Sequence, residues 1–212
     1  MKKVLIVDDH PSIRLVFRMQ LEKILGIDYI AEAENGQVAL DCIRAEKFDM
    51  IVVDLDVPRI NGLELIARVN RIDPEIKLLV LSGQDEAVYA GRAMQAGAHG
   101  FVSKRNELAD FVRAVELIFA GYSCFPKNLL ETSRRGKKVT NPESGSILTD
   151  KELTILRFLA EGLSNKEISE RLFISNKTVS THKTRIMEKL HVDSLVELVD
   201  YARRNKIITV AN

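Results

Sequence analysis

The sequence predicts a doubly wound α/β domain with a five-stranded parallel sheet, followed by a smaller all-α domain of four helices. In the first part of the chain, short apolar runs alternate with helical patterns five times, which is the order that gives a parallel sheet with right-handed crossovers. The last part has helical patterns only, and 212 residues exceed one average domain. We expect domains over residues 1–124 and 147–212, joined by a linker over residues 125–146.

The charge distribution is uneven along a chain of ordinary globular composition. Residues 1–125 contain 15 Lys and Arg against 19 Asp and Glu, whereas residues 126–212 contain 16 against 11. The basic C-terminal part indicates an anion-binding module. The cysteines, Cys42 and Cys124, form no disulfide framework and no C-x-x-C site, so we expect a cytoplasmic protein. No stretch approaches the roughly 20 apolar residues of a membrane span, and no membrane partner is expected.

Polar residues follow four of the five strand candidates. The apolar runs are Val4–Val7 before Asp8 and Asp9, Met50–Val53 before Asp54, Leu78–Leu81 before Ser82, and Gly100–Val102 before Ser103 and Lys104, with Tyr29–Ala33 as the fifth. Helical patterns lie between them over Ser12–Leu25, Gln37–Ala45, Leu63–Arg71, Asp85–Ala96 and Asn106–Ala120. Because the carboxyl ends of parallel strands share one edge of the sheet, we expect these polar residues to converge there.

The residues at this edge fit one chemical task. Clustered carboxylates favour a hard dication such as Mg²⁺, and Asp54 can act as a nucleophile toward a phosphoryl group. Lys104 could neutralise the developing charge, and the Ser82 hydroxyl could donate to a phosphoryl oxygen. Taken singly, Asp54 could be a loop carboxylate or a helix cap, and Ser82 or Lys104 a solvated loop residue. The convergence of four strand ends favours a phosphoryl-transfer site.

Residues 2–121 resemble the receiver domain of two-component response regulators, which has a flavodoxin-like fold. The resemblance implies that Asp54 accepts phosphate from a histidine kinase, and that the protein takes part only in its own phosphorylation and dephosphorylation rather than acting as an enzyme. It also implies that Mg²⁺ is held by Asp8, Asp9, Asp54 and the Asp56 backbone carbonyl.

The resemblance assigns three further residues. Ser82 would close onto the phosphoryl group, Lys104 would form its salt bridge, and Phe101 would be the aromatic switch residue, although a plain core aromatic is the alternative for Phe101. Many receivers have a proline after the lysine, often with a cis bond, where this chain has Arg105. Because a non-proline cis peptide costs about 2.5–4 kcal/mol, we expect a trans bond here.

A second phosphoryl-transfer family offers a competing interpretation. Asp54-Leu55-Asp56 also resembles the D-x-D motif of haloacid-dehalogenase-type phosphatases. That family carries the motif on its first strand, whereas here it follows the third, with an acid pair upstream. The order of the elements therefore disfavours a phosphatase.

The C-terminal part predicts a helix-turn-helix. Thr149-x-x-Glu152 and Ser164-x-x-Glu167 are capping boxes that open two helices, and Ser175 is the expected N-cap of a third helix running to about Leu190. A short helix, a tight turn and a longer helix with a polar and basic outer face are the elements of this motif.

The outer face of the third helix suits DNA. Phosphate contacts are expected from Lys177, Lys183, Arg185 and Lys189, and base or thymine-methyl contacts from Ser180, Thr181 and Thr184. Further candidates are Asn165, Lys166, Thr178 and His182, although His182 is better explained as a packed or phosphate-facing residue. The basic linker residues Arg134, Arg135, Lys137 and Lys138 could also contact phosphates, or could simply be solvated. A solvated basic face is the alternative for the whole helix.

The stretch Leu148–Leu198 resembles the LuxR-type helix-turn-helix, and with the receiver ahead of it the chain resembles the NarL/FixJ response regulators, in particular the BvgA/EvgA branch. Where much of the family has lysine, this chain has Ser180, so base specificity cannot be carried over. The family uses its last helix for dimerisation, which here implies Leu195, Leu198, Val199 and Ala202. Simple packing against the third helix is the other interpretation, and both can hold at the same time for different faces of the helix.

Together these features predict a cytoplasmic transcription regulator that binds double-stranded promoter DNA as a homodimer. The expected partners are a cognate sensor histidine kinase and RNA polymerase. The alternative is a constitutive DNA-binding or polymerase-contacting protein whose receiver only dimerises. A complete set of five site residues argues against this alternative.

Overall fold

A computed structural model describes residues 1–126, 129, 148–205 and 207–208. The chain divides into two compact units, Met1–Glu131 and Thr132–Asn212. The exact domain boundaries remain a prediction. The basic cluster predicted in the linker lies outside the described residues. None of the helices in the described part of the chain is long and apolar enough to cross a membrane.

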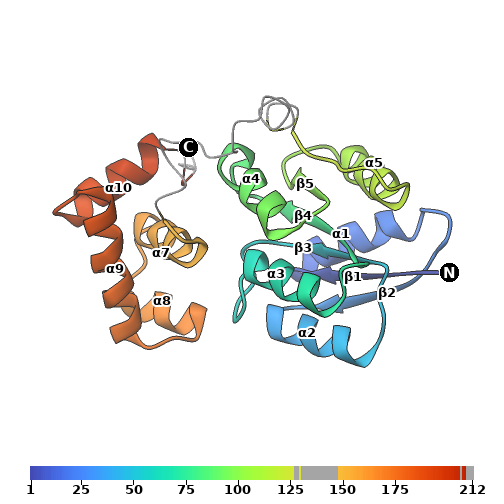
Figure 1. The fold of residues 1–212 in the computed structure, drawn as a ribbon, viewed down its shortest axis with the longest axis horizontal. Helices are drawn as coiled ribbons and strands as arrows, with labels where there is room; N and C mark the ends of the chain where they lie inside the picture. The colour runs from blue at the N-terminus through green and yellow to red at the C-terminus, as the bar shows by residue number, and fades with distance from the viewer. Residues whose placement is uncertain (127–128, 130–147, 206, 209–212) are drawn as a thin grey trace. The chain divides into compact units, whose positions relative to one another are not determined.

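The first unit is built on a five-stranded, all-parallel sheet with the strand order β2-β1-β3-β4-β5 (Figure 1). The strands are β1 (Lys2–Val7), β2 (Ile27–Ala33), β3 (Met50–Val53), β4 (Lys77–Ser82) and β5 (Gly100–Ser103). Val7 pairs with Val53, and Val53 with Val80, so β1, β3 and β4 end at the same edge of the sheet. The predicted doubly wound sheet is confirmed.

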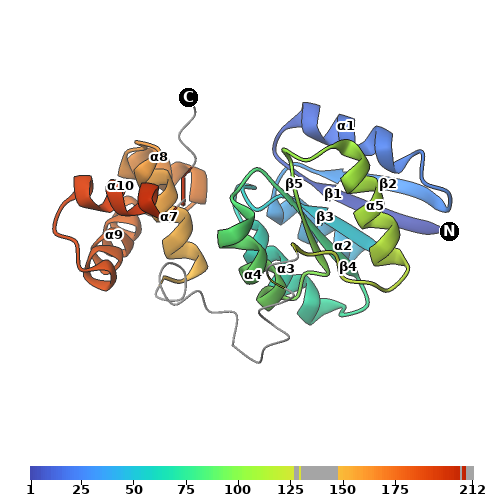
Figure 2. The same cartoon turned by 90° about the horizontal axis from the view of Figure 1, so that it is seen from above.

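Five helices cover the two faces of this sheet. They are α1 (Pro11–Leu21), α2 (Gly36–Ala45), α3 (Gly62–Ile72), α4 (Glu86–Ala96) and α5 (Leu108–Phe119). Helices α1 and α5 lie on one face and the other three on the opposite face (Figures 1 and 2). Phe17 of α1 and Phe111 of α5 meet edge to face, with ring centroids 4.7 Å apart, over the buried strand residues. This packing fixes the strand ends that carry the site.

The first helix is shorter than its apolar pattern predicts. It ends at Leu21 rather than Leu25, and β2 begins at Ile27 rather than Tyr29. Ile24 packs against the core, whereas Leu25 is exposed, and Gly26 has a φ of 89°. The apolar residues after Leu21 therefore belong to a turn that reverses the chain, for which the left-handed glycine is required.

The chain after α5 extends the sheet beyond β5. Cys124 forms a parallel bridge to Gly100: the Phe101 N–H donates to the Cys124 carbonyl at 2.8 Å, and the Cys124 N–H donates to the His99 carbonyl at 2.9 Å. A Cβ atom on Gly100 would lie 2.8 Å from the Cys124 carbonyl oxygen, so this close approach needs glycine. The end of the first unit is thereby tied to the strand that carries Phe101.

The second unit has the predicted four helices. They are α7 (Asp150–Ala160), α8 (Asn165–Leu172), α9 (Asn176–Leu190) and α10 (Leu195–Arg204). Both predicted capping boxes form, and Ser175 accepts a hydrogen bond from the Thr178 N–H as the N-cap of α9. Phe173 ends α8 with a φ of 52°, which turns the chain sharply into α9. The predicted helix-turn-helix is present.

Candidate functional site

Three carboxylates converge at the carboxyl edge of the sheet, as the strand ends predict. Ligand atoms of Asp8, Asp9, His10 and Asp54 all lie within 4.8 Å of one another. The Asp8 and Asp54 side chains are 2% and 3% exposed, and that of Asp9 is 36% exposed. Two buried carboxylates and a third at the rim form an acidic pocket that is open toward solvent on the side of Asp9.

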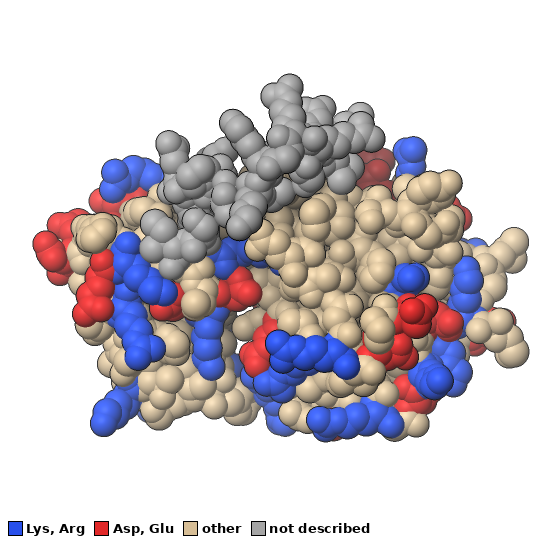
Figure 3. Space-filling model, viewed as in Figure 1, with Lys and Arg blue, Asp and Glu red and all other residues tan. Residues whose placement is uncertain are grey.

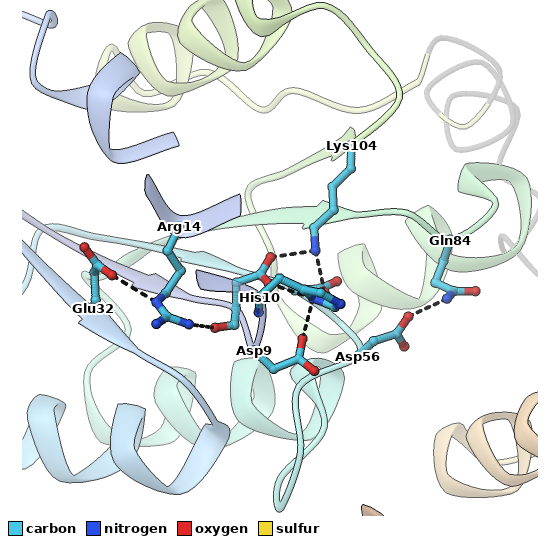
Figure 4. A network of polar contacts seen from close by, with 9 residues as sticks. Asp9, His10, Arg14, Glu32, Asp56, Gln84 and Lys104 are labelled. Atoms are coloured by element: carbon cyan, nitrogen blue, oxygen red, sulfur yellow. Dashed lines mark hydrogen bonds and ion pairs between the residues drawn. The ribbon is translucent and has the colours of Figure 1, made fainter. Parts of the chain in front are cut away.

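Lys104 extends from the end of β5 into this pocket (Figure 4). Its Nζ lies 2.6 Å from Asp54 Oδ2 and 2.5 Å from Asp8 Oδ2. Burial alone would lower the pKa of Lys104, but the ion pairs with Asp54 and Asp8 raise it. Lys104 therefore stays charged and neutralises part of the acid cluster.

Burial sets the protonation of Asp54. It raises the pKa of Asp54 to about 6, and the nearby Asp56 and Asp8 add to this effect, while the Lys104 ammonium acts against it. A buried carboxylate whose charge is unfavourable gains most from an added cation. The Asp54 Oδ1 atom is buried and accepts no hydrogen bond from the described residues. Carboxylate oxygens with an unsatisfied buried acceptor fit a hard cation such as Mg²⁺.

His10 is a pocket neighbour that the strand-end pattern did not identify. Its Nδ1 lies 2.7 Å from Asp9 Oδ1 and 3.2 Å from Asp8 Oδ1, and its backbone N–H donates to Asp8 Oδ1 at 2.8 Å. The signal in the sequence was its position directly after the acid pair.

Ser82 and Phe101 lie on neighbouring strands beside the pocket. Ser82 is fully buried at the end of β4, and its Oγ accepts a hydrogen bond from the Gln84 N–H at 3.3 Å. Phe101 is buried on β5, opposite Val80. The Gln84 side chain donates to the Asp56 carboxylate and so joins the loops after β4 and β3 (Figure 4). The Lys104–Arg105 peptide is trans, as expected.

The third helix of the second unit presents the predicted polar face. Lys177, Ser180, Thr181, Thr184 and Arg185 are exposed, and Val179 and Ile186 are buried on the opposite side. The Thr181 and Thr184 hydroxyls donate to the backbone carbonyls of Lys177 and Ser180, four residues earlier. Basic side chains lie over this unit interspersed with acidic ones (Figure 3).

Several of the predicted DNA-contact residues have partners inside the domain. The Thr178 Oγ1 lies 2.8 Å from the Ser175 Oγ at the helix cap, and the Asn165 amide donates to Ser180 Oγ at 3.1 Å. The Lys189 Nζ is 2.6 Å from Oε2 of the buried Glu152. Lys166 is exposed and Lys183 half-buried, so both can still reach a phosphate.

The His182 side chain packs partly inside the domain and is not fully exposed on the polar helix face. Its side chain is half-buried, and its Nδ1 is buried without a hydrogen-bond partner among the described residues. Burial, with the nearby Lys151, lowers the pKa of His182. A neutral, packed imidazole agrees with the interpretation preferred from the sequence.

The predicted dimer residues of α10 differ in their exposure, and their role in dimerisation stays a prediction. Leu198 and Ala202 have no exposed surface and pack within the domain. Val199 is half-buried, whereas Leu195 and Val196 are 42% and 71% exposed. The period of the helix placed Leu198 and Ala202 on one side, but it could not distinguish the side facing α7 from a free one.

Comparison with known proteins agrees with this architecture. The response regulator receiver domain family matches residues 4–116, and the luxR family of bacterial regulatory proteins matches residues 146–202. The Fimbriae Z protein of Escherichia coli K12 is 42% identical over 205 residues, covering 97% of this chain and 98% of that protein. The virulence-factor transcription regulator BvgA of Bordetella pertussis is 42% identical over 206 residues, with the same coverage.

A solved structure shares both domains. RcsB from Salmonella enterica serovar Typhimurium, bound to the promoter rprA in the presence of the phosphomimetic BeF₃⁻, has 25% identity and a TM-score of 0.69, covering 94% of this chain and 97% of that one. An acid pocket on a receiver fold, followed by a helix-turn-helix, defines a two-component response regulator with a DNA-binding domain. The chain belongs to the NarL/FixJ family of these transcription regulators, as predicted.

Proposed function

We propose that this response regulator is switched by phosphorylation of Asp54 and that the switch controls promoter binding. The observation that carries the proposal is the convergence of Asp8, Asp9 and Asp54, with Lys104 paired to Asp8 and Asp54. A structural ion pair would not need a third carboxylate beside the two that pair with the lysine. The same convergence disfavours a receiver that acts only as a constitutive platform for dimerisation.

In the reaction, a carboxylate oxygen of Asp54 attacks the phosphorus of a phosphohistidine on the kinase. The new O–P bond forms as the P–N bond breaks, and the histidine leaves with the bonding electron pair. Asp8, Asp9, Asp54 and the Asp56 carbonyl would hold Mg²⁺, which offsets charge on the transferred phosphoryl group. Lys104, already 2.6 Å from Asp54, pairs with the phosphoryl oxygens.

The conformational response involves β4, which pairs with the strand that ends just before Asp54, and β5, which pairs with β4. Ser82 would donate its hydroxyl to the phosphoryl group, which moves the loop that also carries Gln84. Phe101 is buried on β5, and Lys104 directly follows this strand. When Lys104 pairs with the phosphoryl group, β5 should therefore shift. The phosphoryl group thereby favours one of two packings of β4 and β5.

The helix-turn-helix is the output element. Lys177 and Arg185 would contact phosphates, and Ser180, Thr181 and Thr184 would contact bases. RcsB structures include dimers bound to DNA, and we extend this assembly to the present chain, with Leu195 and Val196 as the exposed apolar residues of α10. A cognate histidine kinase, promoter DNA and RNA polymerase complete the set of partners in the cytoplasm.

Incubation with acetyl phosphate and Mg²⁺, followed by intact-mass measurement, tests the phospho-acceptor. The wild type should gain one phosphoryl group, and should lose it with hydroxylamine, which cleaves acyl phosphates. Asp54→Asn should gain none, while Asp110→Asn, a change at an exposed aspartate of α5, should behave as the wild type. Equal labelling of Asp54→Asn and wild type would refute the assignment.

A further inference from the structure

The main chain at Asp8 is held by the side chain of Arg14, which lies on a helix and not at a strand end. The Arg14 guanidinium, on the first turn of α1, donates from Nη1 to the Asp8 carbonyl oxygen at 2.7 Å. The Asp8 N–H donates to the Ala33 carbonyl at 3.1 Å. Both backbone groups of Asp8 are therefore occupied, and the peptide plane that leads from Asp8 to Asp9 is fixed.

Arg14 is itself held in place by the edge strand. Its Nε donates to Glu32 Oε2 at 2.9 Å (Figure 4), and Glu32 Oε1 accepts from Arg18 Nη1 at 2.9 Å. The Arg14 side chain is only 14% exposed. Burial alone would raise the pKa of Glu32, but the hydrogen bonds from Arg18 and Arg14 lower it, so the carboxylate stays charged. The guanidinium thus bridges α1, the end of β1 and β2.

We propose that Arg14 is a positioning residue for the acid pair Asp8 and Asp9. By fixing the peptide between them, it directs both carboxylates toward one metal position, and Glu32 keeps the guanidinium in the orientation this requires. The inference rests on the proposed function, because it assumes that the pocket binds Mg²⁺. Side chains that orient metal ligands commonly change metal affinity by 10–100-fold when they are removed.

The sign of the effect separates positioning from simple electrostatics. A guanidinium near a cation site repels the cation, so charge alone predicts that removal of Arg14 tightens Mg²⁺ binding. Positioning predicts that removal weakens it. Arg18 provides the matched control, because it lies one helical turn after Arg14, carries the same charge and also pairs with Glu32. Its side chain donates hydrogen bonds to Glu22 and Glu32.

Calorimetric titration of Mg²⁺ into the full chain tests the proposal. Arg14→Gln should raise the Kd by roughly tenfold, the low end for outer-shell partners, and Arg18→Gln should leave it within about twofold. Far-UV circular dichroism should show that both variants are folded at the titration temperature. If Arg14→Gln does not fold, Arg14→Met, which keeps the apolar stem, takes its place.

The outcomes are distinct. Unchanged or tighter binding in the Arg14 variant, with Mg²⁺ binding intact in the wild type, overturns the positioning role alone. Equal weakening in the Arg14 and Arg18 variants also overturns it, since a loosened α1 would then be the cause. A wild type that binds no Mg²⁺ overturns the proposed function and this inference together.

Discussion

At the scale of single residues, Asp54 shows how a functional demand opposes stability. The carboxylate is almost fully buried beside Asp8, and Lys104 is shared between the two acids. A folded-state pKa raised from 3.8 to about 6 means that the folded chain binds more protons than the unfolded chain between these pH values. The free energy of unfolding therefore falls as the pH rises from about 4 to about 6, and it stays at this lower value above pH 6.

Asp54→Asn should consequently stabilise the protein in Mg²⁺-free buffer. The raised pKa of Asp54 corresponds to at most about 3 kcal/mol above pH 7, and part of this is lost because Lys104 keeps only Asp8 as its charged partner. Urea unfolding at pH 8 and at pH 4 measures the effect, which should be largest at pH 8 and near zero at pH 4. A variant that is less stable than the wild type at pH 8 would contradict the burial argument.

Single residues also show where the sequence could not assign a role. Thr178 and Lys189 belong to a polar helix face by periodicity, but Thr178 contacts the N-cap residue Ser175 and Lys189 pairs with Glu152. Both partners come from positions that the helical period does not specify. The contact of Arg14 with Asp8 could not be predicted for a related reason. Arg14 lies on a helix, whereas the strand-end pattern identifies only residues that follow a strand.

At the scale of elements, the bridge between Cys124 and β5 gives the receiver a physical connection to its linker. The Phe101 N–H that pairs with Cys124 belongs to the strand that ends at Ser103, just before Lys104. Movement of β5 on phosphorylation would therefore act on the residue directly before the predicted linker. The short apolar run Gly100–Val102 predicted the strand, but nothing local in the sequence predicted a partner beyond α5.

Gly100→Ala should detach this bridge, because the new Cβ would lie 2.8 Å from the Cys124 carbonyl oxygen. Such overpacking costs about 1–3 kcal/mol, so alkylation of the half-buried Cys124 thiol should rise by about an order of magnitude. Mass spectrometry after iodoacetamide treatment measures the rate, and Cys42 in the same molecule is the internal reference. An unchanged ratio of Cys124 to Cys42 labelling would show that the bridge tolerates a side chain.

The two capping boxes of the helical unit provide another comparison between elements. Glu152 accepts hydrogen bonds from the Thr149 N–H at 2.8 Å and from Lys189 Nζ at 2.6 Å, and it is buried, whereas Glu167 caps α8 at the surface. Glu152 thus connects the start of α7 to the end of α9. The sequence predicted both caps equally and could not show that Glu152 has a tertiary partner, whereas no hydrogen bond joins Glu167 to another element in the described part of the chain.

Glu152→Gln should therefore lower the free energy of unfolding more than Glu167→Gln does. Loss of the charge leaves the Lys189 ammonium with a weaker acceptor, and we expect a destabilisation of about 2 kcal/mol for Glu152→Gln and a smaller one for Glu167→Gln. Thermal unfolding followed by circular dichroism at pH 7 compares the variants. Equal losses would mean that the pair with Lys189 adds nothing to the cap.

At the scale of the whole molecule, alternation of strands and helices was sufficient to predict the sheet, and the direction of parallel strands was sufficient to place Asp8, Asp9, Asp54, Ser82 and Lys104 together. These features follow from local pattern and topology. The exposed residues of α10 could not be predicted in this way, because Leu195 and Leu198 are the same residue type on one helix. They differ only in whether a neighbouring element covers them.

We propose that the acid pocket is a switch coupled to assembly. Sedimentation velocity of the wild type and of Asp54→Asn, each with Mg²⁺ and with or without BeF₃⁻, tests this coupling. The wild type alone should shift to a heavier or more compact species when BeF₃⁻ is added, because the anion occupies the position of the phosphoryl group on Asp54. An identical response of both proteins, or a wild type whose sedimentation and DNA binding are both unaffected by BeF₃⁻, would contradict the account.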